Sequence, residues 1–259
     1  MSYSYIEIEK NDRIQYIILS RQEKKNALNY DFVTELKDAL QAAENDNSTK
    51  VIIIKAKGNV FSAGADLEYL QQLQNFSFEE NLADSNHLKD LFLHIYTSKK
   101  VVIAQVEGHA IAGGCGLATV CDFCFAVPDA KFGYTEVKIG FIPALVMVFL
   151  IRKINGSKAK ELLLTGKLIG ANEAAAIGLI NAVADQDRIE IFVKDFATAL
   201  CNEASAQSIA ATKEMLNKIS SMDLSSALDY AARMNANTRA SEDCKKGIES
   251  FLKKEKINW

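Results

Sequence analysis

Two glycine-containing segments combine residue types whose spacing could do chemistry. They are FSAGADL at 61–67 and EGHAIAGGCGLATVCD at 107–122. Each begins where an apolar stretch ends and a helical pattern starts, and small residues there let the backbone approach a ligand closely. The first N–H groups of a helix have no partner inside it, and the helix dipole favours negative charge beside them. Two such helix starts that met at one oxygen atom would stabilise an oxyanion.

Either segment alone would also fit an ordinary tight turn. Neither is a GxGxxG fingerprint after a first strand, and neither is a Walker A loop with its lysine, so nucleotide binding is not indicated. The two segments together, in this order, are much more specific than either one.

A proton-transferring group would have to accompany an oxyanion site. Glu136 stands in the stretch YTEVKIGFIP, shortly after the second segment. A single glutamate in such a stretch can be an ordinary solvated residue at a strand end. Placed opposite an oxyanion site, it is the best candidate for a general acid or base.

The elements that must position these residues follow from the hydrophobic pattern. Alternating apolar residues on either side of Asn11-Asp12 predict a hairpin, and two later apolar runs predict strands buried on both faces of a parallel sheet. Helices alternate with these strands, which indicates right-handed βαβ units with ligands bound at the carboxyl ends of the strands. The expected strands are 4–9, 14–20, 51–57, 101–108 and FCFAV, and the expected helices are 30–44, 67–97 and 113–121.

After Asn181 the pattern becomes entirely helical. Amphipathic runs predict a helical appendage rather than further sheet, at 187–203, 205–219, 225–237 and 241–254. We therefore expect an α/β core over residues 1–200 and a helical domain over 201–259.

Composition excludes several function classes. The chain has 259 residues and a net charge of −3 without a dense basic block, so nucleic acid is not an expected partner. No apolar run is long enough to span a bilayer, and the first residues resemble neither a secretory signal nor a transit peptide. Five cysteines, an odd number, argue against a disulfide framework, and their spacing argues against zinc. We expect a cytoplasmic protein that acts without a metal.

The motifs taken together resemble the crotonase (enoyl-CoA hydratase/isomerase) superfamily. The resemblance covers nearly the whole chain. It rests on RQEKKNALN at 21–29, FSAGADL at 61–67, Gly113-Gly114 with Cys121-Asp122, FGYTE at 132–136, GFIP at 140–143, LTG at 164–166 and AAAIGLI at 174–180. It implies a spiral core of repeated β-β-α units followed by helices that form a homotrimer or a hexamer.

By this resemblance the N–H groups of Ala65 and Gly113 form an oxyanion hole for a thioester oxygen, and Glu136 is the acid or base. Coenzyme A is then the carrier of the substrate, and no redox cofactor is implied. The residues expected to contact the substrate or coenzyme A are Lys25, Ala27, Ala63, Gly64, Asp66, Leu67, Gly114 and Gly116.

The acyl group is less well defined. Hydratases of this superfamily usually carry a second glutamate in the helix after the glycine pair, and this chain has Gly116 there. A missing carboxylate would remove repulsion against a substrate carboxylate, which favours a branched or dicarboxylic enoyl-CoA. The stretch 142–146, IPALV, is similar to bacterial methylglutaconyl-CoA hydratase-like members.

Several alternatives to hydration stay open. With one glutamate the same enolate chemistry also serves double-bond isomerases and acyl-thioester decarboxylases. A non-catalytic acyl-CoA-binding module is a further alternative. An RNA-binding role is opposed by electrostatics, because the early helix carries one lysine, Lys37, among several acids. His109 suggests a serine-peptidase-like triad, but no nucleophile elbow accompanies it.

Overall fold

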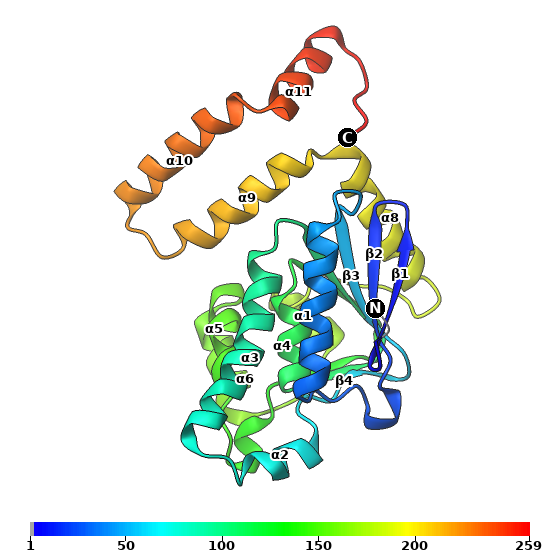
Figure 1. Ribbon diagram of the computed structural model, residues 1–259, viewed down its shortest axis with the longest axis vertical. Helices are drawn as coiled ribbons and strands as arrows, with labels where there is room; N and C mark the ends of the chain where they lie inside the picture. The colour runs from blue at the N-terminus through cyan, green and yellow to red at the C-terminus, as the bar shows by residue number, and fades with distance from the viewer. Residues whose placement is uncertain (1–2) are drawn as a thin grey trace.

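Two β-sheets and eleven α-helices make up the chain in the computed structural model, which describes residues 3–259. The larger sheet has six strands in the order β1-β2-β3-β5-β7-β10 (Figure 1). Their bounds are β1 Ile6–Asn11, β2 Ile14–Leu19, β3 Val51–Ala56, β5 Val101–Val106, β7 Phe123–Ala126 and β10 Ala182–Val183. This mixed architecture agrees with the α/β class expected from the sequence.

The strands of the larger sheet consist mainly of apolar residues, and helices pack on the sheet and bury them. The β1–β2 pair is the expected antiparallel hairpin, and Asp12 in its turn has a φ of 53°. From β2 to β10 all pairings are parallel, and every residue of β2 and β5 is buried. Helix α1 (Tyr30–Asn45) packs on β1 and β2, while α8 (Ile189–Glu203) packs on β2, β3, β5 and β7. Burial on both faces explains the continuous apolar runs in the sequence.

A second, smaller sheet was not expected from the sequence. Its order is β4-β6-β8-β9, with β4 at Val60–Ser62, β6 at His109–Ile111, β8 at Lys131–Gly133 and β9 at Ile169–Gly170. These strands have two or three residues each, too few for an alternating pattern to be seen. The two glycine-containing segments therefore include residues of β4 and β6, and their glycines follow these short strands rather than the long buried ones.

The two sheets together show a repeated β-β-α unit. Strands β3, β5 and β7 each lie in the larger sheet, and each is followed by a short strand of the smaller sheet, β4, β6 and β8. Helices follow each pair: α2 (Leu67–Leu73) and α3 (Phe78–Thr97), then α4 (Gly113–Val120), then α5 (Ala144–Lys153) and α6 (Gly156–Thr165) after the short 3-10 helix η2 (Glu136–Ile139). Each unit forms one turn of a spiral, as the family resemblance implied.

The single helix predicted over 67–97 is wrong. The chain leaves α2 after Leu73, and α3 begins after Ser77 with a complete capping box between Ser77 and Glu80. Such a box satisfies two backbone N–H groups at a helix start and so fixes a new N-terminus there. The break turns α2 away from α3, and both helices can then line one space.

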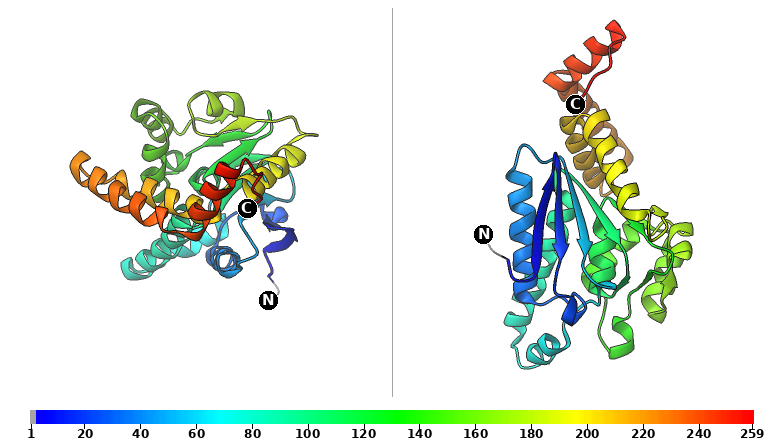
Figure 2. Two further views of the ribbon diagram at one scale, coloured as in Figure 1. Left: turned by 90° about the horizontal axis from the view of Figure 1, so that it is seen from above. Right: turned by 90° about the vertical axis from the view of Figure 1, so that its right-hand side faces the viewer.

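The C-terminal helices extend away from the sheets. Helix α7 (Ala171–Ala176) precedes β10, and α9 (Ala206–Ile219), α10 (Leu224–Arg239) and α11 (Glu242–Lys253) follow α8 (Figures 1 and 2). The sequence predicts a boundary between a core and a helical domain at residue 200, which lies inside α8. This domain boundary stays a prediction. Over residues 3–259, no helix has the length and apolarity that a bilayer crossing requires.

A nearly buried ion pair fastens α9 to the larger sheet. The Nζ of Lys213 lies 2.6 Å from Oδ2 of Asp122 and donates to the carbonyl of Lys100 over 2.7 Å. The same Oδ2 accepts from the backbone N–H of Val102 at 2.8 Å. Asp122 thus joins the end of α4, strand β5 and the helical extension.

We predict that Lys213→Ala lowers the free energy of unfolding by about 2 kcal/mol, because it leaves a partly desolvated Asp122 without its cation. The control is Lys218→Ala on the same helix, which removes an exposed pair with Glu214. Urea denaturation of both variants measures the difference. Equal effects of the two substitutions would show that the Lys213–Asp122 pair does not fasten the helix.

Candidate active site

Three turns of the spiral bring three chain segments to one place. Strand β6 pairs in parallel with both β4 and β8, with Ser62 opposite Ala110 and Ile111 opposite Gly133. Because parallel strands end at the same edge, the residues that follow them converge. Ala65, Gly113 and Glu136, which follow β4, β6 and β8, all line one cavity of about 550 Å³.

The N–H of Ala65 has no hydrogen-bond acceptor within residues 3–259. A short bridge with Leu28 explains this. Leu28 N–H donates to the carbonyl of Gly64 at 2.7 Å, and Asp66 N–H donates to the carbonyl of Leu28 at 2.9 Å. In this parallel bridge the carbonyl of Gly64 and the N–H of Asp66 both bond to Leu28. The N–H of Ala65, which lies between them, therefore points to the other side of the strand.

The N–H of Gly113 is the first of helix α4 and, in the part of the chain that the structure describes, it also has no acceptor. The preceding Ala112 has a φ of 51° and a ψ of −124°, a conformation that costs a non-glycine residue about 1–3 kcal/mol. Its N–H donates to the carbonyl of Gly133 at 2.8 Å, which holds the turn. Strain of this kind is typical of functional sites.

Close contact between the two segments depends on Gly64. Its φ is +90°, and a Cβ there would lie 2.9 Å from Cβ of Ala112, 3.0 Å from the carbonyl oxygen of Ile111 and 3.4 Å from the nitrogen of Gly113. A side chain at this position would push the segments apart. Gly64 therefore brings the two free N–H groups together, and it does not itself line the cavity.

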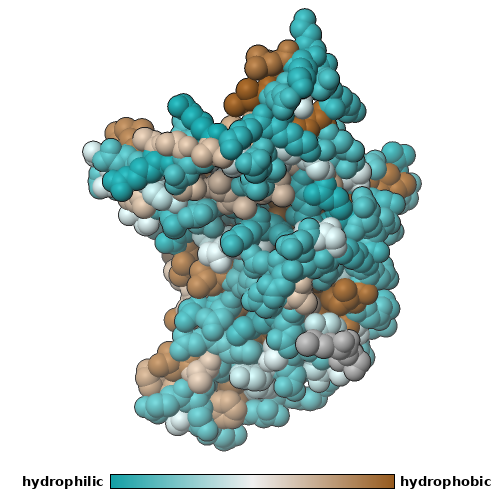
Figure 3. Space-filling model, turned by 45° about the horizontal axis from the view of Figure 1, so that its top comes forward, coloured by the Kyte–Doolittle hydropathy of each residue, from teal (hydrophilic) through white to brown (hydrophobic). Residues whose placement is uncertain are grey.

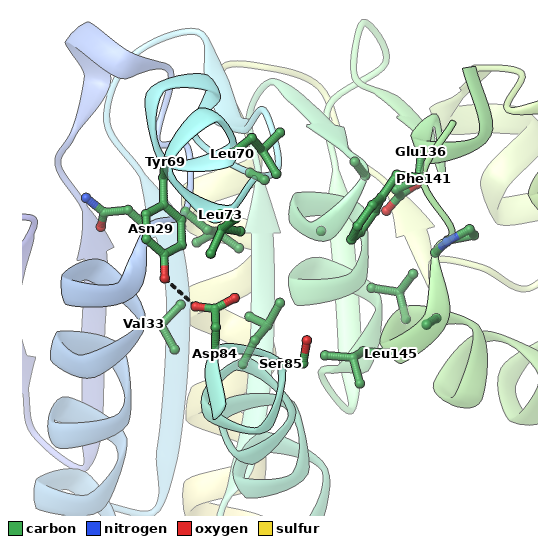
Figure 4. Close-up of a pocket in the computed structure, with 18 of the residues that line it drawn as sticks. Asn29, Val33, Tyr69, Leu70, Leu73, Asp84, Ser85, Glu136, Phe141 and Leu145 are labelled. Carbon is green, nitrogen blue, oxygen red and sulfur yellow. Dashed lines mark hydrogen bonds between the residues drawn. The ribbon is translucent and has the colours of Figure 1, made fainter. Parts of the chain in front are cut away.

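Glu136 begins η2 and points its carboxyl group into the same cavity (Figure 4). Its Oε2 is buried and has no hydrogen-bond partner within residues 3–259. Burial raises the pKa of this carboxyl above the ordinary glutamate value, since water no longer solvates the charged form. A desolvated carboxyl group in a cleft has the properties of a general acid or base.

The other expected contact residues divide into two groups. Ala63 and Leu67 line the cavity, and Lys25 and Ala27 lie on the segment that leads to the lining residue Leu28. Asn26 holds this segment, because its buried side chain donates to the carbonyls of Lys57 and Val60.

Asp66, Gly114 and Gly116 do not line the cavity, so the geometry does not give the direct substrate contact expected of them. Asp66 is buried, lies 2.6 Å from Nη1 of Arg21 and caps α2. A Cβ on Gly114 would lie 2.4 Å from the carbonyl oxygen of Ser62. These residues pack against the two loops on the side that does not face the cavity.

Gly116 has a neighbour that explains its lack of a side chain. A Cβ there would lie 2.1 Å from Cγ1 of Val146 and 3.5 Å from Cζ of Phe92. Val146 and Phe92 themselves line the cavity. The space beside Gly116, where a glutamate side chain would lie, is therefore filled by the apolar side chains of Val146 and Phe92.

The wall of the cavity across from Glu136 holds polar residues that the sequence did not reveal. Tyr69 on α2 and Asp84 and Ser85 on α3 line it, and Tyr69 donates a hydrogen bond to Asp84 (Figure 4). His87 also lines the cavity and stacks on Tyr30 at a centroid distance of 4.1 Å. The continuous helix expected over 67–97 gave no reason to place Tyr69 beside Asp84; the capping pair Ser77 and Glu80 was the one signal of the break between them. His109, the triad candidate, does not line the cavity.

Comparison with known proteins agrees with this geometry. The family model for Enoyl-CoA hydratase/isomerase matches residues 9–259. The chain belongs to the enoyl-CoA hydratase/isomerase family. A protein of Syntrophomonas wolfei named crotonyl-CoA hydratase is 33% identical over 261 residues, which cover 100% of this chain and 99% of the relative. A Mycobacterium tuberculosis relative named probable enoyl-CoA hydratase echA8 is 32% identical over 258 residues, 98% of this chain and 97% of the relative.

Solved structures of the family share the fold. The crystal structure of an enoyl-CoA hydratase from Shewanella pealeana has a TM-score of 0.94 at 28% identity and covers 99% of this chain and 96% of that chain. The crotonase fold expected from the motifs is thereby confirmed, and the chain is an enzyme of the enoyl-CoA hydratase/isomerase family.

We predict that Gly116→Ala destabilises this enzyme by about 2 kcal/mol, because Val146 is packed where the new methyl group would lie. Val146→Ala should lose stability by itself, since its side chain is buried. The double variant should lose less stability than the sum of the losses in the two single variants. Chemical denaturation gives all three values, and strictly additive losses would refute the contact.

Proposed function

We propose that this enzyme catalyses the reversible addition of water to a short 2-enoyl-CoA. Two observations support the proposal most strongly: among the described residues the N–H groups of Ala65 and Gly113 have no acceptor, and the buried carboxyl of Glu136 shares their cavity. The names of the relatives agree with this chemistry.

In the proposed reaction the thioester oxygen accepts hydrogen bonds from Ala65 and Gly113. The Glu136 carboxylate removes a proton from water while the water oxygen forms a bond to C3 of the enoyl group. The electron pair of the double bond moves towards the thioester oxygen, and the two N–H groups stabilise the resulting enolate. The protonated Glu136 then delivers its proton to C2. Water is added across the double bond, and Glu136 ends as it began.

Coenzyme A would carry the acyl group in this reaction, and no resident metal or redox cofactor is needed. We assign its path to the segment from Lys25 through Ala27 to Leu28, with Ala63 and Leu67 on the other side. Leu28, Ala63 and Leu67 line the cavity, and the exposed Lys25 accepts a hydrogen bond from the N–H of Ala63 at 3.0 Å through its carbonyl oxygen. The five cysteines are unpaired, which fits a reducing compartment such as the cytoplasm.

We propose that the acyl group of the substrate is short and neutral, and either straight or branched. Most of its lining is apolar, including Val33, Leu70, Leu73, Leu88 and Val146, and the lining set, drawn from residues 3–259, contains neither lysine nor arginine. A substrate carboxylate would find no cation there and would face Asp84. The dicarboxylic substrate that Gly116 suggested is therefore not part of the proposal.

The decisive test is incubation with crotonyl-CoA in ¹⁸O-labelled water. We predict that one label enters a 3-hydroxyacyl thioester and that Glu136→Gln lowers kcat about 100-fold to 10,000-fold, the usual contribution of a general acid or base. The control is Glu173→Gln, which changes an exposed carboxylate that does not line the cavity. Double-bond migration or release of carbon dioxide without label would instead establish isomerisation or decarboxylation. Binding without turnover would establish a non-catalytic module.

The pH dependence gives a second readout of the same variants. The base must be ionised to attack, so kcat/KM should rise with pH through the pKa of Glu136. Because burial raises this pKa, the acidic limb should lie above the ordinary glutamate value. The limb should vanish in Glu136→Gln and persist in Glu173→Gln. A limb that is the same in both variants would contradict the assignment of Glu136.

We also propose that the C-terminal helices join copies of the chain into a trimer or a pair of trimers. Neither α10 nor α11, both wholly described, contains a buried residue. Large apolar side chains are nevertheless exposed on them, including Leu224, Leu228, Ile248, Phe251 and Leu252. Apolar side chains gather at this end of the molecule (Figure 3). An amphipathic helix whose large apolar side chains stay exposed within its own chain indicates burial against another chain.

Light scattering should give a mass of three or six chains for the wild type. Phe251→Asp should shift the mass to that of one chain, because Phe251 is 81% exposed in the single chain and would bring a charge into the interface. Lys245→Asp on the same helix changes the charge at an exposed polar residue and should keep the assembly. A wild-type mass of one chain would overturn the proposal.

A further inference from the structure

A polar group of three side chains interrupts the apolar wall formed by α2 and α3. Tyr69, Asp84 and Ser85 line the cavity among Leu70, Leu73 and Leu88 (Figure 4). They come from the two helices that the capping box at Ser77 separates. Glu136, on η2, lies across the cavity from them.

The hydrogen bonds of these side chains leave specific atoms free. The Tyr69 hydroxyl donates to Oδ1 of Asp84, while within residues 3–259 neither Oδ2 of Asp84 nor Oγ of Ser85 has a hydrogen-bond partner. Burial and the neighbouring Asp84 both raise the pKa of Tyr69, so the phenol keeps its proton and orients the carboxylate. Over the same residues Asp84 makes no ion pair, and burial together with Lys37 lowers the pKa of the neighbouring His87, although Asp84 acts in the opposite direction.

The unpaired acceptor of the half-buried Asp84 therefore faces a largely apolar part of the cavity, whereas Ser85 is exposed and its hydroxyl can bond to water. A group that holds its free hydrogen-bonding atom towards a cavity specifies a polar atom of the ligand, because a ligand lacking it would leave the group desolvated and unpaired. A ligand that reaches this wall should therefore donate a hydrogen bond to Asp84.

We propose that Asp84, oriented by Tyr69, recognises a hydroxyl group on the acyl chain, away from the thioester. This inference rests on the proposed function, since it takes the thioester oxygen to lie at Ala65 and Gly113. A hydroxyl donates to Oδ2 of Asp84 and brings no net charge into the apolar part of the cavity. The substrate class is a short hydroxylated 2-enoyl-CoA.

Other substituents fit this wall less well. A carboxylate would repel Asp84 and has no proton to donate. An ammonium group would also pair with Asp84, but its full charge would have to be desolvated among the apolar side chains of the cavity. A methyl group would bury Oδ2 of Asp84 without a partner. The wall therefore ranks a hydroxyl above each of them.

The test compares pairs of 2-enoyl-CoA thioesters of increasing chain length, where one member of a pair ends in a hydroxyl and the other in a methyl group. In the wild type, kcat/KM for hydration should favour the hydroxyl member about tenfold at the chain length that reaches Asp84, as expected for one hydrogen bond to a charged group. Asp84→Leu should abolish or invert this preference. Tyr69→Phe should weaken it, because the carboxylate then loses its orientation.

Glu79→Gln is the matched control, because it removes an exposed carboxylate from the same helix outside the cavity. It should keep the wild-type preference. Calorimetric binding of the saturated hydroxyl-ended and methyl-ended thioesters gives a readout that does not need turnover. Asp84→Asn, which keeps the shape of the side chain, covers the case in which Asp84→Leu does not fold, and should reduce the preference.

An unchanged preference in the folded Asp84 variants would overturn the inference and leave hydration intact. Equal turnover of both members of every pair by the wild type would do the same. A wild type that hydrates no thioester, crotonyl-CoA included, would instead refute the proposed function, and this inference with it.

Discussion

Parallel pairing of three very short strands is the constraint on which the site depends. Strands β4, β6 and β8 bond side by side, so the residues leaving them line one cavity although 71 positions separate Ala65 from Glu136 in the chain. The long strands β3, β5 and β7 fix the spacing of the spiral, and burial of their apolar side chains supplies its stability. Without that core, strands of three residues would not pair, because short ladders are marginal in water.

Electrostatic contrast across the cavity then sets its chemistry. One side presents two N–H groups without acceptors, and the other presents a carboxyl group whose pKa is raised by burial. Apolar lining keeps water from screening either side, so charge that develops between them is stabilised more strongly than it would be in solution. The strained φ of Ala112 is stable only because the bond from its N–H to Gly133 and the contact with Gly64 hold it.

The sequence predicted the long elements well, because their periodicity is strong. The hairpin, α1, the buried strands and the four C-terminal helices all lie close to the expected ranges. The second sheet escaped prediction, since two or three residues show no period. The break before Ser77 was missed although the pair Ser77 and Glu80 forms a capping signal that could have revealed it.

Residues of the site were predictable only in part. Motif resemblance pointed to Ala65, Gly113 and Glu136, and all three line the cavity. It could not separate residues that face the cavity from those packed behind it, so Gly114 and Gly116 were expected to touch the substrate. That distinction depends on contacts between distant segments, such as Gly116 with Val146. Asp84 and Tyr69 belong to no motif, and only the angle between two helices brings them together.

The bridge between Leu28 and Ala65 uses main-chain atoms alone, and the turn before Gly113 is likewise held through peptide groups. The part of the pocket that would polarise a thioester is thus made of peptide groups and requires only that position 64 has no side chain, whereas the opposite wall is made of exchangeable side chains on two helices. Substitutions on α2 and α3 can therefore change which acyl groups the pocket accepts without altering the backbone shape of its other half.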